Sequence, residues 1–157
     1  MRTRDAGSAR NYVLRLIKFR PRSCLEVHQK LKLKGYASDI IGETISYFKN
    51  IGLLNDAGFA RAWMRNRLSK PLGLKVIELE LKQKGIDEGI IKELVKEARD
   101  SLDETKIVNT LARQRLDKLL KNKEPPEKLR YKLCNFLLRR GFSCDIVNDA
   151  VEGLIKG

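Results

Sequence analysis

Apolar residues recur at helical spacing before each of three glycines, Gly35, Gly85 and Gly141. The residue four positions before each glycine is a leucine, and the residue eight positions before it is also apolar. These pairs are Val27 and Leu31, Ile77 and Leu81, and Leu133 and Leu137. Because they lie one turn apart on a helix, each pair occupies one face. The pattern therefore predicts an amphipathic helix before every glycine.

Each glycine also carries the signature of a helix end. A cation precedes it and a bulky apolar residue follows it, namely Lys34 and Tyr36, Lys84 and Ile86, and Arg140 and Phe142. Glycine can adopt the left-handed conformation after the last turn, and the cation complements the negative end of the helix dipole. Polar residues that can cap a new helix, or complement the positive end of its dipole, come next: Ser38 and Asp39, Asp87 and Glu88, and Ser143 and Asp145.

The following helix repeats its own apolar face, at six, ten and thirteen positions after the glycine. The residues are Ile41, Ile45 and Phe48, then Ile91, Val95 and Ala98, then Val147, Val151 and Leu154. The spacing between copies leaves room for one more helix in each. The candidates are residues 8–19, a helix capped by Asp56 that ends near Pro71, and residues 102–123. Ser23 and Glu26 form a capping box for the second helix of the first copy.

The sequence thus predicts an all-α fold of three tandem three-helix repeats that form an elongated, curved array. We expect the repeats to span residues 1–54, 55–100 and 101–157. One segment has an alternative, since Ile77, Leu79 and Leu81 alternate with glutamates as in a strand. The register shared with the other two copies favours a helix there.

Charge points to the type of partner. Thirty-three Lys and Arg against twenty Asp and Glu give a net charge of +13. A polyanionic partner, nucleic acid or an assembly that contains it, is the main inference, and a basic protein without such a partner is the alternative. No apolar run approaches the ~20 residues that span a bilayer, so no membrane association is expected.

Candidate chemistry is sparse. His28 is the single histidine, and Cys24, Cys134 and Cys144 have no metal-ligand spacing. We interpret the thiols as reduced core residues, which is typical of a cytoplasmic protein. Phosphate-binding glycine loops and nucleophile or zinc-protease motifs are absent. We therefore expect a protein that is not an enzyme and has no cofactor and no metal.

Basic residues recur at matched positions of the three copies and form the candidate binding site. They are Lys30, Lys34, Arg65, Arg67, Lys82, Lys84, Arg139 and Arg140. Solvated helix faces, or cations at helix ends, are the simpler interpretation of any one of them. Their recurrence predicts a stripe that tracks a phosphate backbone or an acidic groove. Aromatic residues for base stacking are few, and Trp63 and Phe59 are expected in the core, so sequence-specific readout is not expected.

Four segments in order resemble the RecX family, the bacterial modulators of the recombinase RecA. They are RPRSCLEVHQKLKLKGY (20–36), IGLLNDAGFARAWMRNR (51–67), LELKQKGID (79–87) and FLLRRGFSCDIV (136–147). The family pattern R-x-x-S-x-x-E-L is matched at Arg20, Ser23 and Glu26, with Val27 in place of the leucine. A second pattern is matched by Leu54, Asp56, Phe59, Ala60 and Trp63 or Met64. The match covers nearly the whole chain.

This resemblance implies tandem three-helix repeats and a regulatory role in DNA repair, recombination and the SOS response. It implies a cytoplasmic protein, expected to be a monomer, that binds RecA, lies in the groove of the RecA–DNA filament, and inhibits ATP hydrolysis, strand exchange and coprotease activity. Direct binding of single- or double-stranded DNA is left open by the resemblance. The alternative function is a free-standing, sequence-independent nucleic-acid-binding protein.

Overall fold

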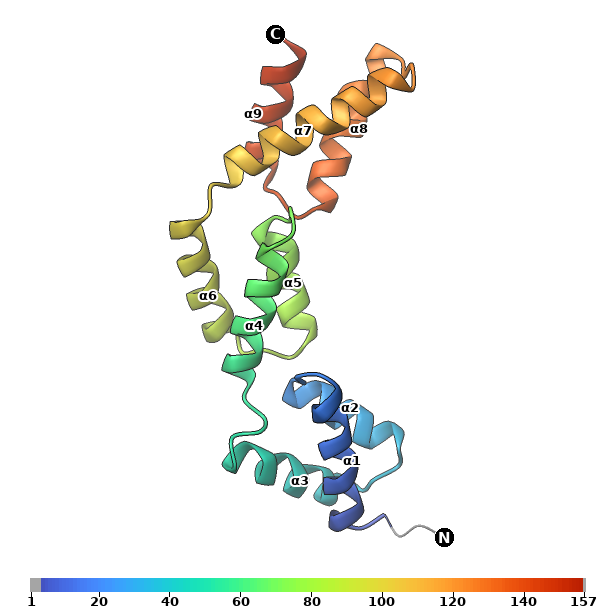
Figure 1. Cartoon of the computed structure of the whole chain (residues 1–157), viewed down its shortest axis with the longest axis vertical. Helices are drawn as coiled ribbons and strands as arrows, with labels where there is room; N and C mark the ends of the chain where they lie inside the picture. Colours follow the sequence, from blue (N-terminus) through green and yellow to red (C-terminus); the bar gives the residue numbers. More distant parts are fainter. Residues whose placement is uncertain (1–3, 157) are drawn as a thin grey trace. The chain divides into compact units, whose positions relative to one another are not determined.

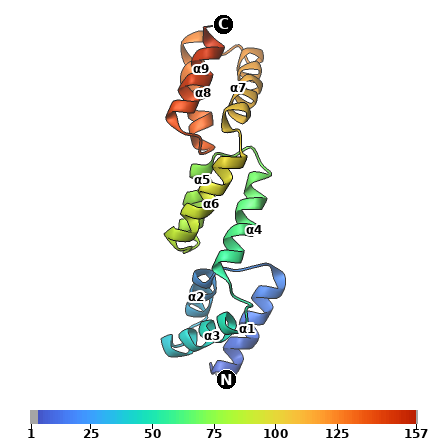
Figure 2. The same ribbon diagram turned by 90° about the vertical axis from the view of Figure 1, so that its left-hand side faces the viewer.

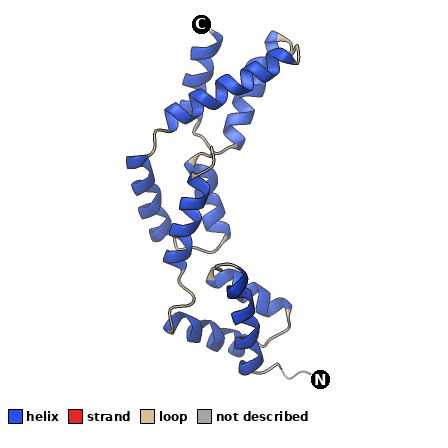
Figure 3. Ribbon diagram, viewed as in Figure 1, coloured by secondary structure: helices blue, strands red, loops and turns tan. Residues whose placement is uncertain are grey.

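The structure, a computed structural model, describes residues 4–156, and within this range it contains nine α-helices and no strand (Figures 1 and 3). The helices are α1 (Ala6–Phe19), α2 (Cys24–Leu33), α3 (Ser38–Asn50), α4 (Asp56–Leu68), α5 (Leu74–Gln83), α6 (Glu88–Ser101), α7 (Glu104–Lys121), α8 (Pro126–Arg139) and α9 (Cys144–Ile155). The predicted all-α class is confirmed. The ambiguous segment from Ile77 to Leu81 lies inside α5, so the helical interpretation is correct.

The chain divides into two compact units. The first unit is Met1–Trp63 with Leu81–Ile91, and the second unit is Met64–Glu80 with Lys92–Gly157. Helices α1, α2 and α3 pack on one another in the first unit, and α7, α8 and α9 do so in the second (Figure 2). The predicted repeat boundaries and the curved array stay predictions, and residues 1–3 and 157 of the outer repeats lie outside the described part.

Each unit has its own hydrophobic core, which includes most residues of the predicted faces. In the first unit the core is Ala9, Val13, Val27, Leu31, Ile41, Phe48 and Leu54. In the second it is Val108, Leu111, Ala112, Leu119, Leu133, Leu137, Phe142, Val147, Ala150 and Val151. The leucines four positions before the glycines are all fully buried. Burying a leucine side chain contributes about 1.5–3 kcal/mol, so these positions set the helix orientation.

The three glycines end their helices as predicted. Their φ angles are 78°, 74° and 90° at Gly35, Gly85 and Gly141. In the first copy the Tyr36 N–H donates to the Leu31 carbonyl at 3.2 Å and the Gly35 N–H to the Lys32 carbonyl at 2.9 Å. This pair of bonds is the Schellman arrangement, which satisfies carbonyls that the helix leaves free.

The residues that cap the helix N-termini agree less well with the predictions. The capping box of Ser23 and Glu26 is confirmed. The predicted cap at Asp56 is wrong, because α4 already begins there and Asn55 Oδ1 accepts from the Gly58 N–H at 3.0 Å. Ser38 is also no cap, since it is the first residue of α3, and the side chain of Ser143 makes no capping bond.

A buried hydroxyl in α3 leads to a stability prediction. Thr44 is fully buried, and its Oγ1 has no hydrogen-bond partner. Leu94 and Ala150 occupy the corresponding place in the other two copies. Because a buried unpaired hydroxyl keeps its desolvation cost, we expect Thr44→Val to raise the free energy of unfolding by about 1 kcal/mol.

Denaturant unfolding followed by circular dichroism measures this change. Thr110→Val on α7 is the control, because its exposed hydroxyl already donates to the Lys106 carbonyl at 2.9 Å. In the control variant, the free energy of unfolding should be unchanged or slightly lower. A loss of stability in Thr44→Val would show that its hydroxyl is satisfied in solution.

Candidate partner-binding surface

Several of the eight candidate cations are exposed on their helices. Lys30 on α2, Arg65 on α4 and Arg139 on α8 are exposed, and they make no ion pair within residues 4–156. One of them belongs to each predicted repeat. Lys82 is exposed on α5. A partner can therefore approach these four cations without displacing the core.

Lys84 makes two side-chain contacts inside the first unit. Its Nζ lies 2.8 Å from Glu26 Oε1 and 4.9 Å from the centroid of the Trp63 ring. Glu26 also accepts from Arg20 Nη2 at 2.8 Å and from the Ser23 N–H at 3.1 Å. Burial alone would raise the pKa of Glu26, but the bonds from Arg20, Lys84 and Ser23 outweigh it and lower this pKa to about 2.

The remaining candidates also touch neighbouring side chains. Arg67 donates to both carboxylate oxygens of Glu80, at 2.8 and 2.5 Å. The Arg140 guanidinium lies 4.9 Å from the centroid of Phe136 and donates to the Pro71 carbonyl at 3.4 Å. Lys34 is exposed, with its Nζ 5.6 Å from the centroid of Tyr12. All eight stay predictions as binding residues, and the contacts of Lys84, Arg67 and Arg140 give these three a structural role as well.

Consecutive repeats are joined by a contact that occurs twice. At the first junction, inside the first unit, Asp56 Oδ1 at the start of α4 accepts from the Cys24 N–H at the start of α2. At the second junction, inside the second unit, Glu104 Oε1 at the start of α7 accepts from the Leu74 N–H at the start of α5. Both distances are 2.9 Å. In each case a carboxylate of the following repeat caps a helix of the preceding one.

The glycine turns contact the same helix starts. A Cβ built on Gly85 would lie 2.6 Å from the Leu25 Cβ, and one built on Gly141 would lie 2.5 Å from the Val76 backbone nitrogen. The Gly73 N–H donates to the Arg140 carbonyl at 2.7 Å. Gly85 and Gly141 therefore allow close packing at a junction and also end a helix. The cations beside them, Lys84 and Arg140, contact residues of the preceding repeat.

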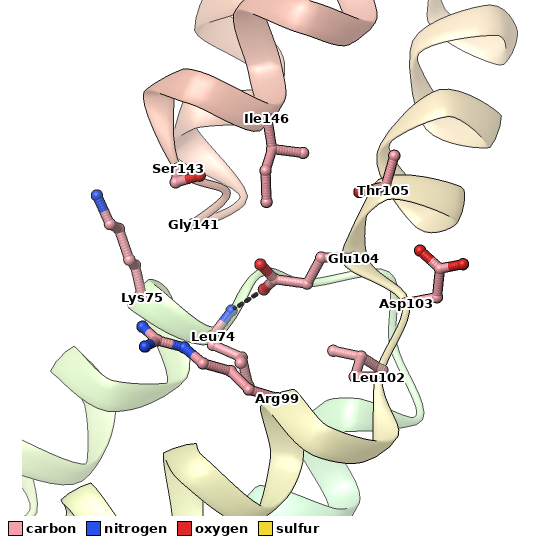
Figure 4. A pocket seen from close by; sticks show the side chains of 10 residues that line it. All are labelled: Leu74, Lys75, Arg99, Leu102, Asp103, Glu104, Thr105, Gly141, Ser143 and Ile146. Carbon is pink, nitrogen blue, oxygen red and sulfur yellow. Dashed lines mark hydrogen bonds between the residues drawn. The ribbon is translucent and has the colours of Figure 1, made fainter.

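A cavity of about 350 Å³ lies at the second junction (Figure 4). Lys75 and Arg99 line it together with Asp103 and Glu104, so its formal charges balance. The Glu104 carboxylate points at the Leu74 N–H, and the lining contains no histidine or cysteine. The Glu104 bond makes this lining part of the contact between the second and third repeats.

Charge is divided between the helices of each repeat. The third helices carry much of the acid: α9 has Asp145, Asp149 and Glu152 and no cation, and α3 has Asp39 and Glu43 against Lys49. The first two helices of each repeat carry most of the cations, although α6 has Lys92, Lys96 and Arg99 beside four acids. Several exposed cations on α1 and around the α7–α8 turn lie outside the candidate set: Arg15, Lys18, Lys118, Lys121, Lys123 and Lys128. Local charge density, rather than recurrence between copies, is the signal that would have identified them.

The thiols give no sign of catalysis or metal binding. Burial and the Asp56 carboxylate raise the pKa of Cys24 to about 11, so this thiol stays protonated. Cys144 is exposed at the start of α9, so its assignment to the core is wrong. Over residues 4–156 no group of three His, Cys, Asp or Glu side chains could hold a metal ion. None of the helices described is long and apolar enough to cross a membrane.

Three family models match the chain in order. They describe the first three-helix domain of RecX over residues 9–48, the second over residues 55–94, and the third over residues 107–151. Together they cover most of the chain, and their order is that of the predicted repeats.

Curated relatives and solved structures agree with these matches. The regulatory protein RecX of Clostridium botulinum (strain Eklund 17B / Type B) is 33% identical to this chain. The match covers 83% of this chain and 61% of the length of that relative. The regulatory protein RecX of Mycolicibacterium smegmatis is 30% identical, with 96% of this chain and 81% of the relative covered. The crystal structure of RecX from Lactobacillus salivarius has a TM-score of 0.77 at 28% identity, with 96% of both chains covered. A second crystal structure of a regulatory protein RecX, at 18% identity, shares the fold with a TM-score of 0.81 and covers 94% of this chain and 73% of that one.

Proposed function

The chain belongs to the RecX family of regulatory proteins, and from this premise we propose that it binds RecA and RecA–DNA filaments and inhibits the recombinase. The inhibited activities are ATP hydrolysis, strand exchange and coprotease activity, so the protein modulates DNA repair and recombination. The observation that supports this role most directly is an exposed cation in every repeat, at Lys30, Arg65 and Arg139, on helices held by buried cores.

These cations suit a partner that carries phosphates or carboxylates in a groove. The helices that carry them are already packed, so binding orders side chains but no backbone, which limits the entropy cost. A chain lodged in a filament groove contacts more than one recombinase subunit, so it blocks filament extension or the closure needed for turnover. This mechanism needs no catalytic group.

A titration of the DNA-dependent ATPase of RecA tests the proposal. A filament regulator should inhibit at ratios well below one protein per RecA subunit. The alternative, a free-standing nucleic-acid-binding protein, is supported by the net charge of +13. It should inhibit only when it coats the DNA, and its affinity should fall by about 0.7 log units per neutralised phosphate for each tenfold rise in salt.

A matched pair of charge-reversed variants tests which surface is used. We expect the variant Lys30→Glu, Arg65→Glu and Arg139→Glu to need about tenfold more protein for half-inhibition, since rim charges steer and hold an anionic partner. The control variant is Lys49→Glu, Lys96→Glu and Lys156→Glu, whose cations lie on or just after the third helices. Both variants lower the net charge from +13 to +7.

The control should inhibit like the wild type. Equal losses in the two variants would mean that only total charge matters, and no loss in either would reject the three cations as contacts. Circular dichroism verifies that both variants are folded.

A further inference from the structure

Phe19 is the most exposed large apolar side chain among the described residues. It is the last residue of α1, and 92% of its surface is accessible. Arg15, one turn back, lies on the same side of the helix, and Lys18 and Arg20 are the exposed neighbours of Phe19 in the chain. A ring presented to water in this way is accessible to a partner, and its burial against that partner would be favourable.

Acidic groups near this ring are few and already paired. Residues 10–25 contain Arg10, Arg15, Lys18, Arg20 and Arg22 and no Asp or Glu. From the neighbouring elements, Glu26 is bound to Arg20 and Lys84, and Glu43 is bound to Arg10 at 3.1 Å. Arg15 and Lys18 make no ion pair within the described range. The surroundings of Phe19 therefore keep a positive charge.

The loop that follows Phe19 is held in place. Arg20 donates to the Pro21 carbonyl at 2.9 Å and to both Glu26 oxygens, at 2.8 and 3.2 Å. Glu26 is in turn fixed by Lys84 and by the capping box of α2. The backbone on both sides of Phe19 is thus ordered before any partner arrives, which lowers the entropy cost of binding at the ring.

We propose that Phe19 is a stacking platform for a base of single-stranded DNA, with Arg15 and Lys18 contacting the adjacent phosphates. Aromatic residues and Arg also occur in protein–protein interfaces, but the centres of those interfaces are depleted of lysine and of charge, whereas single-strand binding sites combine aromatic rings with several cations. The bases of a duplex are stacked on each other, so the ring distinguishes single strands from duplexes. This inference goes beyond the proposed inhibition of RecA, and it is tested without RecA, so either can fail alone.

Binding of the full chain to a fluorescein-labelled 20-nucleotide oligothymidylate, followed by anisotropy, tests the platform. We expect Phe19→Ala and Phe19→Leu each to weaken binding about tenfold, since stacking is sensitive to loss of the ring and leucine retains only the apolar surface. Affinity for a duplex of the same length should change less than twofold. Leu79→Ala is the control, because Leu79 is 54% exposed but lies between Glu78 and Glu80; it should bind like the wild type.

A direct reporter completes the experiment. Phe19→Trp should keep wild-type affinity, and its added fluorescence, measured against the Trp63 background of the wild type, should be quenched by the oligonucleotide. Wild-type affinity of Phe19→Ala, wild-type affinity of Phe19→Leu, an equal loss on the duplex, or an unquenched Phe19→Trp would each overturn the stacking contact.

Discussion

Replacing Gly73 by alanine is expected to lower the free energy of unfolding by about 4 kcal/mol, because a Cβ cannot be accommodated at the second junction. A Cβ on Gly73 would lie 2.2 Å from both the carbonyl carbon and the oxygen of Gly141, which are backbone atoms. To relieve this clash the two backbone segments must move apart, which breaks two hydrogen bonds. The Gly73 N–H donates to the Arg140 carbonyl at 2.7 Å, and the Lys75 N–H donates to the Gly141 carbonyl at 3.2 Å. Overpacking costs about 1–3 kcal/mol and each lost bond about 1 kcal/mol.

Chemical denaturation measures the total, and hydrogen exchange at the Lys75 amide reports the junction itself. Gly42→Ala is the matched control, because Gly42 lies inside α3 and a Cβ built on it would have no neighbouring atom within 4 Å. Alanine is the better helix former, so this control should gain about 0.5–1 kcal/mol. A loss below 1 kcal/mol in Gly73→Ala would mean that the two backbones approach less closely in solution.

Most of the fold could be predicted because its information is local. Helical spacing identified the buried positions Val27, Leu31, Leu133 and Leu137, and the glycines identified the helix ends. These features depend on residues within about two turns of one another. Three aligned copies also resolved the single ambiguity, at Ile77 to Leu81, because a strand in one copy would break the register of the other two.

The junctions could not be predicted, because they join residues far apart in the chain. Asp56 looks like the start of its own helix, yet its carboxylate caps α2, 32 positions away. Gly73 looks like an ordinary loop residue, and only the approach of Gly141 shows why alanine cannot replace it. Tertiary contacts decide the role of a polar or small residue in such places, and local propensity does not reveal them.

The same reasoning explains the mixed outcome for the candidate site. Lys84 and Arg140 were nominated because a cation recurs before each glycine, but the junctions recur too, and both cations have partners there. A double charge reversal at these positions should therefore weaken the junctions, so it cannot separate binding from stability. Lys30, Arg65 and Arg139 have no such partners, which makes them the informative positions.

The stability of the first junction should depend on pH through Glu26. The pKa of this carboxyl is lowered from 4.5 to about 2 in the folded chain. The folded state therefore binds the proton less tightly than the unfolded state, so the stabilisation is complete above about pH 5. It is lost as the pH falls from about 4.5 to 2. The shift corresponds to about 3 kcal/mol at neutral pH, since one pKa unit is worth about 1.4 kcal/mol.

Unfolding by denaturant at several pH values, with the wild type and Glu26→Gln compared, isolates this carboxyl from the other acids that titrate in the same range. The difference should be about 3 kcal/mol at pH 7 and should vanish near pH 2, where glutamate is protonated and resembles glutamine. Glu43→Gln is the control, because Glu43 is exposed and its pair with Arg10 is screened by solvent. Its difference should stay near zero at every pH. A difference for Glu26→Gln that persists unchanged to pH 2 would show that its packing, rather than its charge between Arg20 and Lys84, holds the first junction.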